Sequence, residues 1–442
     1  MNLAPFVPGV DGPFDAAAAA HLLRHAAFGS RPEERDEAVR VGLQATLERL
    51  FARDEGKAAA QLAALAPSVA QGDDLPRLQA LWLGRMVESA CPLVEKLALF
   101  WHNHFATSFT KIQQCDWMWR QYELFRALGG GPFRELLQAA ARDPALLVWL
   151  DGNSNVKSHP NENFARELFE LFSLGVGHYS ERDVQEAARA FTGWHVRDGR
   201  FWKNERAHDA GAKQLFGAPV EDGGEVVDAA VRHPACAPFL AGKLLSAFVC
   251  DAPSAAAIAE VAAALREEEL SIERTLRRLF GSRLFFAAEQ RRARIAGPIE
   301  WCVGLLRRTR ARCNLKAVAQ AAAAMGQSLF APPNVKGWEG GRTWISSRTL
   351  LARNRFAAAL CHGEGELAIA VDWAKQVGAL AEGAGLPLVA KLEALLTDDA
   401  LEPATRARIV AFADDGAAAG SGVVRVQRVA HQLLGAPEAQ LA

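Results

Sequence analysis

The sequence has no excess of charge of one sign. Its 50 lysines and arginines are balanced by 51 aspartates and glutamates in 442 residues, and it contains no polybasic tract. A balanced chain has no long-range field that attracts a polyanion. We therefore expect no nucleic-acid partner and no attachment to an anionic membrane.

Long apolar runs and paired cysteines are missing as well. No stretch of about 18 apolar residues, the length that spans a bilayer, occurs in the sequence. Residues 1–12 lack the basic and apolar regions of a secretory signal. The seven cysteines are far apart and form no CxxC motif, which is typical of buried thiols in a reduced protein. These absences predict a soluble cytoplasmic protein with no membrane insertion. The location would be periplasmic if an export signal had been removed.

Common catalytic signatures are absent too. The sequence contains no GxGxxG, Walker A, HExxH or GxSxG motif. Dinucleotide binding, nucleoside triphosphate hydrolysis, zincin chemistry and the hydrolase nucleophile elbow therefore lack their usual sequence support.

Helical periodicity accounts for most of what is present. Half of the residues are hydrophobic, so the chain can bury a large core. Apolar residues recur at helical spacing with glycines as stops, and strands and helices do not alternate. The predicted fold class is all-α, a large multi-helix array. We divide it into an N-terminal helical lobe (1–90), a central helical domain with the polar motifs (91–355) and C-terminal Ala-rich helices packed on it (356–442).

Two segments depart from the helical pattern. Residues 194–202 place Asp198 and Gly199 between two short runs of alternating large residues, which predicts one short β-hairpin. Residues 332–345, here called the cleft loop, are rich in Gly, Pro and Trp. We expect this loop to lie over a central cleft, although covering an exposed helix end would suit its composition equally well.

Two histidines, His102 and His104, lie near the end of a helix predicted over 92–106. Side chains two residues apart on a helix differ in direction by about 200°. Both can therefore bind one metal only if the helix ends or distorts there. We take both as candidate metal ligands. The alternative is that each is a hydrogen-bonded, half-buried ring beside Trp101 or Phe105.

A second group of polar residues lies on the helix predicted over 161–174. Glu162, Arg166 and Glu170 are four residues apart, which favours an ion-paired stripe. Glu167 and Glu170, three apart, would instead point one carboxylate pair inward. Flanking Leu and Phe residues leave little exposed face, so some of these charges are expected to be buried and partnered. We take Glu167 and Glu170 as candidate metal ligands, and Glu162 and Arg166 as candidate catalytic residues.

A third group follows the predicted hairpin. His208 and Asp209 offer an imidazole and a hard anionic oxygen, which suit a divalent transition metal. Glu205 and His208 have the ExxH spacing of di-iron bundles, but the sequence has only one copy. The alternative is a surface turn with a cap. Lys213, also a candidate catalytic residue, would orient carboxylates or an anionic substrate together with Arg166.

The ordered motifs of the chain resemble the DUF1800 family of bacterial proteins. The resemblance rests on HLLRHAAFG at 21–29, WHNHF at 101–105, NEN at 161–163, ARE at 165–167, ELFSLG at 170–175, TGW at 192–194, HD at 208–209, Lys213, HPAC at 233–236, PNVKGW at 333–338 and WI at 344–345. It implies a predominantly helical protein. Many members carry export signals and are often encoded beside a sulfatase-like family, which implies a sulfatase-like partner protein. The resemblance implies no particular reaction.

The leading functional hypothesis is a metal-dependent enzyme that acts on an unidentified small molecule, peptide or glycan. Iron is favoured because mixed His and carboxylate ligands without thiolates suit it, and zinc, copper and manganese are alternatives. Oxidative modification is favoured slightly over hydrolysis. A second hypothesis is a metal-free, glycan-active enzyme with two of Glu162, Glu167 and Glu170 as acid and base. A third is a non-catalytic accessory or assembly protein, in which the polar motifs lock helix ends.

Overall fold

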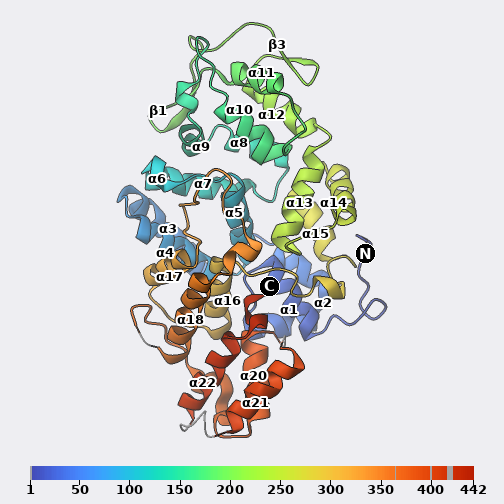
Figure 1. Cartoon of the computed structure of the whole chain (residues 1–442), viewed down its shortest axis with the longest axis vertical. Coiled ribbons are helices and arrows are strands. Elements are labelled where there is room, and N and C mark those ends of the chain that lie inside the picture. The colour runs from blue at the N-terminus through green and yellow to red at the C-terminus, as the bar shows by residue number, and fades with distance from the viewer. Residues whose placement is uncertain (1, 364, 399–400, 416–421) are drawn as a thin grey trace.

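The computed structural model describes residues 2–363, 365–398, 401–415 and 422–442. It is an elongated array of helices with two small antiparallel sheets, which confirms the predicted all-α class (Figure 1). In the described part of the chain, no helix is both long and apolar enough to span a membrane.

The first helices occupy the middle and one side of the molecule (Figure 1). They are α1 (Ala16–Ala26), α2 (Pro32–Leu50), α3 (Gly56–Gln71), α4 (Leu75–Glu88), α5 (Pro92–His104), α6 (Phe109–Ile112) and α7 (Cys115–Leu128). Helix α5 begins with Pro92 at a position where proline is favoured, and it ends at His104.

The next segment forms one end of the molecule, at the top of Figure 1. Its helices are α8 (Phe133–Ala140), α9 (Pro144–Trp149), η1 (Gly152–Ser154), α10 (Asn163–Glu167), η2 (Leu168–Ser173), α11 (Glu181–Phe191) and α12 (Gly223–Arg232). The helix predicted over 161–174 is therefore α10 followed by η2, and η2 is a π-helix. Single π-turns are rare and occur frequently at functional sites.

Two hairpins close this end. The predicted hairpin is confirmed as β1 (Trp194–Arg197) paired with β2 (Arg200–Lys203), and Asp198 and Gly199 both have positive φ in the turn. A second hairpin, β3 (Lys213–Leu215) with β4 (Ala218–Val220), was not predicted. Its turn is Phe216-Gly217, and phenylalanine at positive φ gives no sequence signal for a turn.

The remaining helices return to the middle and build the opposite end (Figure 1). They are α13 (Cys236–Phe248), α14 (Ala255–Glu267), α15 (Ile272–Phe280), η3 (Ala288–Gln290), α16 (Pro298–Thr309), α17 (Leu315–Ala324), η4 (Gly341–Trp344), α18 (Ser347–His362), α19 (Trp373–Val377), η5 (Gly378–Ala381), α20 (Gly385–Leu396), α21 (Pro403–Asp414), α22 (Val423–Leu434) and η7 (Pro437–Gln440).

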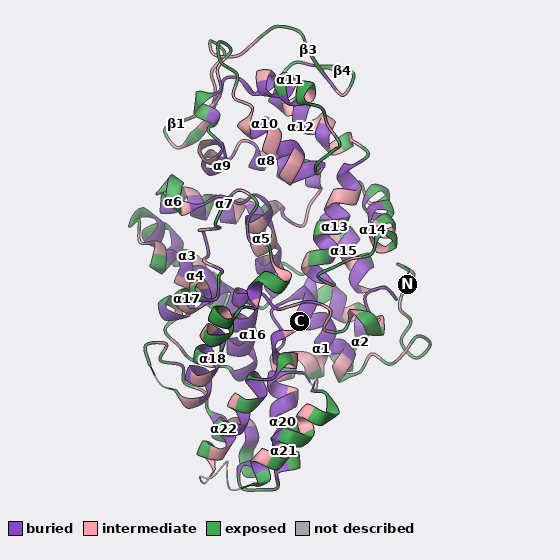
Figure 2. Cartoon of the chain, viewed as in Figure 1, coloured by how far each residue is buried: buried purple, intermediate pink, exposed green. Residues whose placement is uncertain are grey.

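One continuous cluster of buried apolar side chains runs through the whole array, from Leu3 to Ala442 (Figure 2). Buried ion pairs join segments that are distant in sequence: Asp398 pairs with Arg24 of α1 at 2.7 Å and with Arg308 of α16 at 2.8 Å. The N-terminal helices are thus fixed directly to the C-terminal part. The segment boundaries at 90 and 355 stay a prediction.

Candidate functional site

A cavity of about 1070 Å³ forms the central cleft. Its walls come from α5, α13, the start of α16, the segments that precede α14 and α16, and residues 336–344 of the cleft loop. The cleft loop therefore lies on a cleft, as its composition predicted.

Asn103 holds the cleft loop in place. Its Oδ1 accepts a hydrogen bond of 2.6 Å from the Trp338 N–H, and its Nδ2 donates one of 3.3 Å to the Trp338 carbonyl. Gly337 has a φ of +78°, and a Cβ there would lie 2.2 Å from Asn103 Oδ1. This turn therefore requires glycine. The loop thus forms a fixed wall of the cleft. Asn103 lies between the two predicted histidines, and the sequence analysis did not single it out.

Three buried charges form the floor of the cleft. Glu300 accepts a hydrogen bond of 2.7 Å from Lys96 Nζ and another from Arg294 Nη2. Burial by itself would raise the pKa of Glu300. The positive charges of Arg294 and Lys96 have the larger effect and lower this pKa to about 2. Burial lowers the pKa of Lys96 to about 8 even with Glu300 beside it. The floor therefore carries one net positive charge at neutral pH.

Arg294 has one buried donor without a partner among the described residues. The side chain lies at the cleft and the residue is 8% exposed. In the described part of the chain, its buried Nε–H has no hydrogen-bond acceptor. A buried donor without a partner costs about 1–3 kcal/mol.

The exposed cleft walls add more charge. Lys243 has no hydrogen-bond or ion-pair partner among the described residues, and its Nζ lies 5.5 Å from the centroid of the Phe239 ring. Desolvation by the cleft walls lowers the pKa of Lys243, although the side chain is open to the cavity. The lining as a whole has five cationic side chains against three carboxylates, an excess of two positive charges: Lys96, Lys243, Arg294, Lys336 and Arg342 against Asp251, Glu300 and Glu339.

The predicted histidines face different parts of the protein. His104 lines the cleft, and its Nε2–H donates a hydrogen bond of 3.0 Å to the Phe172 carbonyl. Its buried Nδ1 has no partner among the described residues. His102 Nε2 instead accepts a hydrogen bond of 3.1 Å from the Phe330 N–H. Burial lowers the pKa of both rings to about 3, so both are neutral.

The predicted acidic residues divide into two groups. Arg166 pairs with Glu162 at 2.9 Å and with Glu181 at 2.8 Å, on a partly exposed surface. Part of the predicted ion-paired stripe is therefore formed, but Glu181 pairs with Arg166 where Glu170 was expected, and Glu170 accepts a hydrogen bond from the Tyr179 hydroxyl. Such an exposed stripe contributes little to stability. Glu167 and Glu170 lie beside each other at the start of the π-helix, and burial and Glu170 raise the pKa of Glu167.

His208, Asp209 and Lys213 lie together at the hairpin end. His208 Nδ1–H donates a hydrogen bond of 2.9 Å to the Thr192 carbonyl, and Asp209 pairs with Arg189 at 2.7 Å. Lys213 is buried and lies on β3. In the described structure these groups hold the turn after β2, which is the alternative that the sequence left open.

Lys213 is expected to act on stability and not on ligand binding. Its Nζ donates hydrogen bonds to the carbonyls of Gly211 (3.0 Å) and Glu221 (2.9 Å), which lie on either side of the second hairpin. Lys213→Met should lower the free energy of unfolding by about 1–3 kcal/mol, because it leaves these carbonyls unpaired. Urea unfolding measures the loss. Lys203→Met, which removes a partly exposed lysine of the neighbouring hairpin, is the control and should change stability by less than about 1 kcal/mol. Equal effects of the two changes would contradict the assignment.

The structure does not bring the six predicted metal ligands to one centre. His102, His104, the Glu167 and Glu170 pair, and the His208 and Asp209 pair make the separate contacts described above. Within the described ranges, no group of three or more His, Cys, Asp or Glu side chains is placed to hold a metal ion. The described structure does not assemble the predicted six-ligand centre, because the folded chain places these residues in separate surroundings. Metal binding itself stays a prediction.

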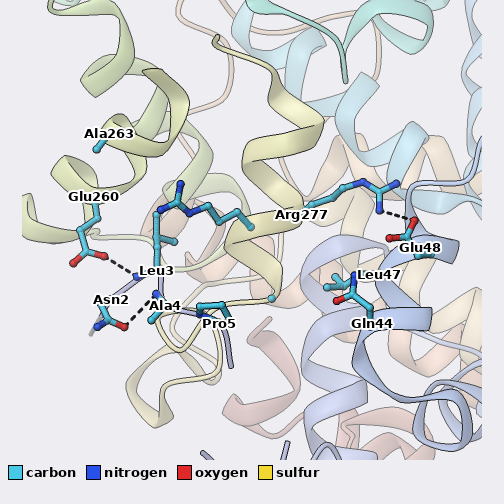
Figure 3. Close-up of a pocket in the computed structure, with 12 residues that line it drawn as sticks. Asn2, Leu3, Ala4, Pro5, Gln44, Leu47, Glu48, Glu260, Ala263 and Arg277 are labelled. Carbon is cyan, nitrogen blue, oxygen red and sulfur yellow. Dashed lines mark hydrogen bonds and ion pairs between the residues drawn. The ribbon is translucent and has the colours of Figure 1, made fainter. Parts of the chain in front are cut away.

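A second cavity, of about 710 Å³, lies between the N-terminal segment, α2, α14 and α15 (Figure 3). Glu260 accepts a hydrogen bond of 2.8 Å from the Leu3 N–H, and Arg277 pairs with Glu48 at 3.0 Å. These charged groups are already partnered, whereas Lys243 of the central cleft has no hydrogen-bond or ion-pair partner among the described residues. We therefore place the candidate site in the central cleft.

The motifs that build this cleft also identify the family. A family model described as "Protein of unknown function (DUF1800)" matches residues 21–441. The chain belongs to the DUF1800 family. No curated protein and no solved structure matches it. In this DUF1800 protein, the WHNHF and PNVKGW motifs meet in space, because Asn103 of the first binds Trp338 of the second.

Sequence reasoning missed the charges of the cleft. Lys243 is the only charged residue within α13, and Glu300 stands among apolar residues at the start of α16. A single charge on an otherwise apolar helix must be paired or must face a cavity. That signal was available in the sequence. It indicates neither the partner nor the cavity.

Proposed function

We propose that this DUF1800 protein is an enzyme whose central cleft binds an anionic organic substrate. The observation that carries the proposal is the excess of positive charge in the cleft lining, where the exposed ammonium of Lys243 has no hydrogen-bond or ion-pair partner among the described residues. A cavity of about 1070 Å³ is of the size that holds small organic ligands. Carboxylate, phosphate and sulfate groups are the acceptors that such donors prefer.

Two further groups supply chemistry beside the bound anion. His104 lines the cleft as a neutral imidazole, and its buried Nδ1 is a hydrogen-bond acceptor with no partner among the described residues. Glu167 has a raised pKa and interacts with Lys336 of the cleft loop. A raised pKa makes the ionised carboxylate a stronger base. These groups favour acid and base chemistry on a substrate that the cations hold.

The geometry favours an anion over the metal-dependent function predicted from the sequence. A metal ion in the cleft would lie among Lys96, Lys243 and Arg294, whose charges repel it. Of the six predicted metal ligands, His104 alone is among the described residues that line the cleft. Iron, and the alternatives zinc, copper and manganese, therefore stay predictions, and the proposed function does not depend on them.

Anion binding can be tested with a single substitution. Isothermal titration of the protein with citrate at low salt should show binding that weakens as salt increases. Lys243→Gln should weaken that binding by about 10-fold, because it removes one charge-assisted hydrogen bond from an exposed position that the fold does not need. Lys391→Gln, at an exposed lysine of α20, is the control and should leave binding unchanged. The proposal fails if citrate, phosphate and sulfate all show no binding, or if the two variants behave alike.

A further inference from the structure

A row of ring side chains on one wall of the cleft indicates what the anionic substrate carries beside its charge. We infer that the substrate is an aromatic acid, whose acid group binds at Lys243 and whose ring packs on Phe239 and Phe100. All three side chains line the cavity. The inference rests on the proposed function of the cleft, because it assigns the uncharged part of the same ligand.

The rings form a continuous row across two helices. The ring centroid of His104 lies 6.1 Å from that of Phe100, which is also on α5, and 6.1 Å from that of Phe239 on α13. The Phe100 centroid in turn lies 5.8 Å from that of Phe248 on α13. These separations are within the range of contacts between aromatic rings. All four residues line the cleft, and we call them the aromatic wall.

Lys243 lies beside this wall. It follows Phe239 by four residues, which is about one turn of α13, and its Nζ lies 5.5 Å from the centroid of the Phe239 ring. The side chain is exposed and has no hydrogen-bond or ion-pair partner among the described residues. A ligand whose acid group binds this ammonium therefore has the ring of Phe239 next to it. The contacts for the charge and for the ring are adjacent on one helix.

The aromatic wall has apolar surface that a ligand can cover. Phe100 and Phe239 are only half-buried, and removing such apolar surface from water favours binding. His104, between them, is fixed by the hydrogen bond from its Nε2–H to the Phe172 carbonyl. Burial lowers the pKa of His104 to about 3, so this ring carries no charge at neutral pH. The wall between Phe100 and Phe239 is therefore uncharged, and the charge for the acid group comes from Lys243.

An aromatic ring fits this wall better than a saturated ring of the same size. Aromatic rings have negative faces and positive edges, so they attract one another beyond the gain from burying apolar area. A saturated ring gains only from burial. The cavity of about 1070 Å³ is large enough for a small organic acid to lie along the wall.

Matched ligands separate the parts of this proposal in titration calorimetry at low salt. Hydrocinnamate and cyclohexanepropanoate carry the same acid group on an aromatic and a saturated ring, and hydrocinnamamide carries the aromatic ring without a charge. The wild-type protein should bind hydrocinnamate about 3-fold or more tightly than cyclohexanepropanoate, although the saturated ring is at least as apolar. It should bind hydrocinnamate about 10-fold or more tightly than the amide, because only the acid pairs with the ammonium.

Substitutions test the wall and the charge separately. Phe239→Leu keeps apolar bulk and removes the ring, so it should weaken hydrocinnamate by about 3-fold or more and abolish the preference over cyclohexanepropanoate. Phe100→Leu should do the same from the other helix. Lys243→Gln should weaken both acids by about 10-fold and leave the amide unchanged. Phe412→Leu, at a half-buried phenylalanine of α21 outside the cleft lining, is the control and should change none of these affinities.

The outcomes distinguish the inference from the proposed function, and circular dichroism confirms that each variant is folded. If neither the two ring acids nor citrate, phosphate and sulfate bind, the proposed function and the inference both fail. If citrate binds but hydrocinnamate does not, or if the two ring acids bind equally and neither leucine variant of the wall changes this, the anion site stands and the aromatic substrate is wrong. An amide that binds as tightly as hydrocinnamate would also overturn the aromatic acid, because Lys243 would then not hold the ligand.

Discussion

Glu300→Gln should lower the free energy of unfolding by about 3–5 kcal/mol. Glu300 is the carboxylate that both Lys96 and Arg294 bind, and all three side chains are buried. Removing its charge leaves two buried cations without compensation, which costs far more than the loss of a surface ion pair. Urea unfolding at pH 7 measures the change. Glu339→Gln removes an exposed carboxylate of the same cleft and should stay within about 0.5 kcal/mol of wild type.

The same substitution should change how stability depends on pH. The pKa of Glu300 is about 2 in the folded protein, against an ordinary value of 4.5. A lowered folded pKa gives stability that is complete above the unfolded pKa and is lost as the pH falls through the folded pKa. Wild type should therefore lose this contribution between about pH 4.5 and 2, and Glu300→Gln should lack that part of the loss. Parallel acid unfolding curves for the two proteins would contradict the assignment of Glu300 as the charged centre of the floor.

Gly337→Ala is expected to displace the cleft loop. The residue has a φ of +78°, and a Cβ would lie 2.2 Å from Asn103 Oδ1 and 2.5 Å from the Asn103 carbonyl oxygen. The strained backbone and the loss of the hydrogen bonds between Asn103 and Trp338 together should cost about 2–4 kcal/mol. Because Lys336, Glu339 and Arg342 move with the loop, citrate binding in the cleft should weaken in parallel.

A matched glycine separates backbone strain from collision. Gly177 has a φ of +89°, and nothing lies within 4 Å of the position of its Cβ. Gly177→Ala should therefore cost only about 1–2 kcal/mol, the strain of an alanine at positive φ, and should leave citrate binding unchanged. Urea unfolding and calorimetry compare the two variants. Equal losses of stability, or an unchanged cleft in Gly337→Ala, would show that Asn103 does not hold the loop.

Local patterns predicted much of the fold. Pro92 begins α5, and apolar residues repeat along it at helical spacing. Asp198 and Gly199 predicted the first hairpin because these two residues adopt positive φ easily. The Gly, Pro and Trp content of residues 332–345 predicted a loop on a cleft. Each of these features depends on residues that are close together in the sequence. The argument about His102 and His104 also held, because two positions on a helix point in different directions.

Only the packing of distant segments decided which polar residues meet. Lys96 and Glu300 are 204 residues apart in the sequence and 2.7 Å apart in space. By contrast, His104 and Glu167 were predicted to share a metal, yet His104 binds a carbonyl and Glu167 lies near Lys336. Helix and turn propensities act over a few residues, so they are readable in one sequence. Contacts between charges arise from burial of the whole core, in which a buried charge takes whichever partner the packing brings to it.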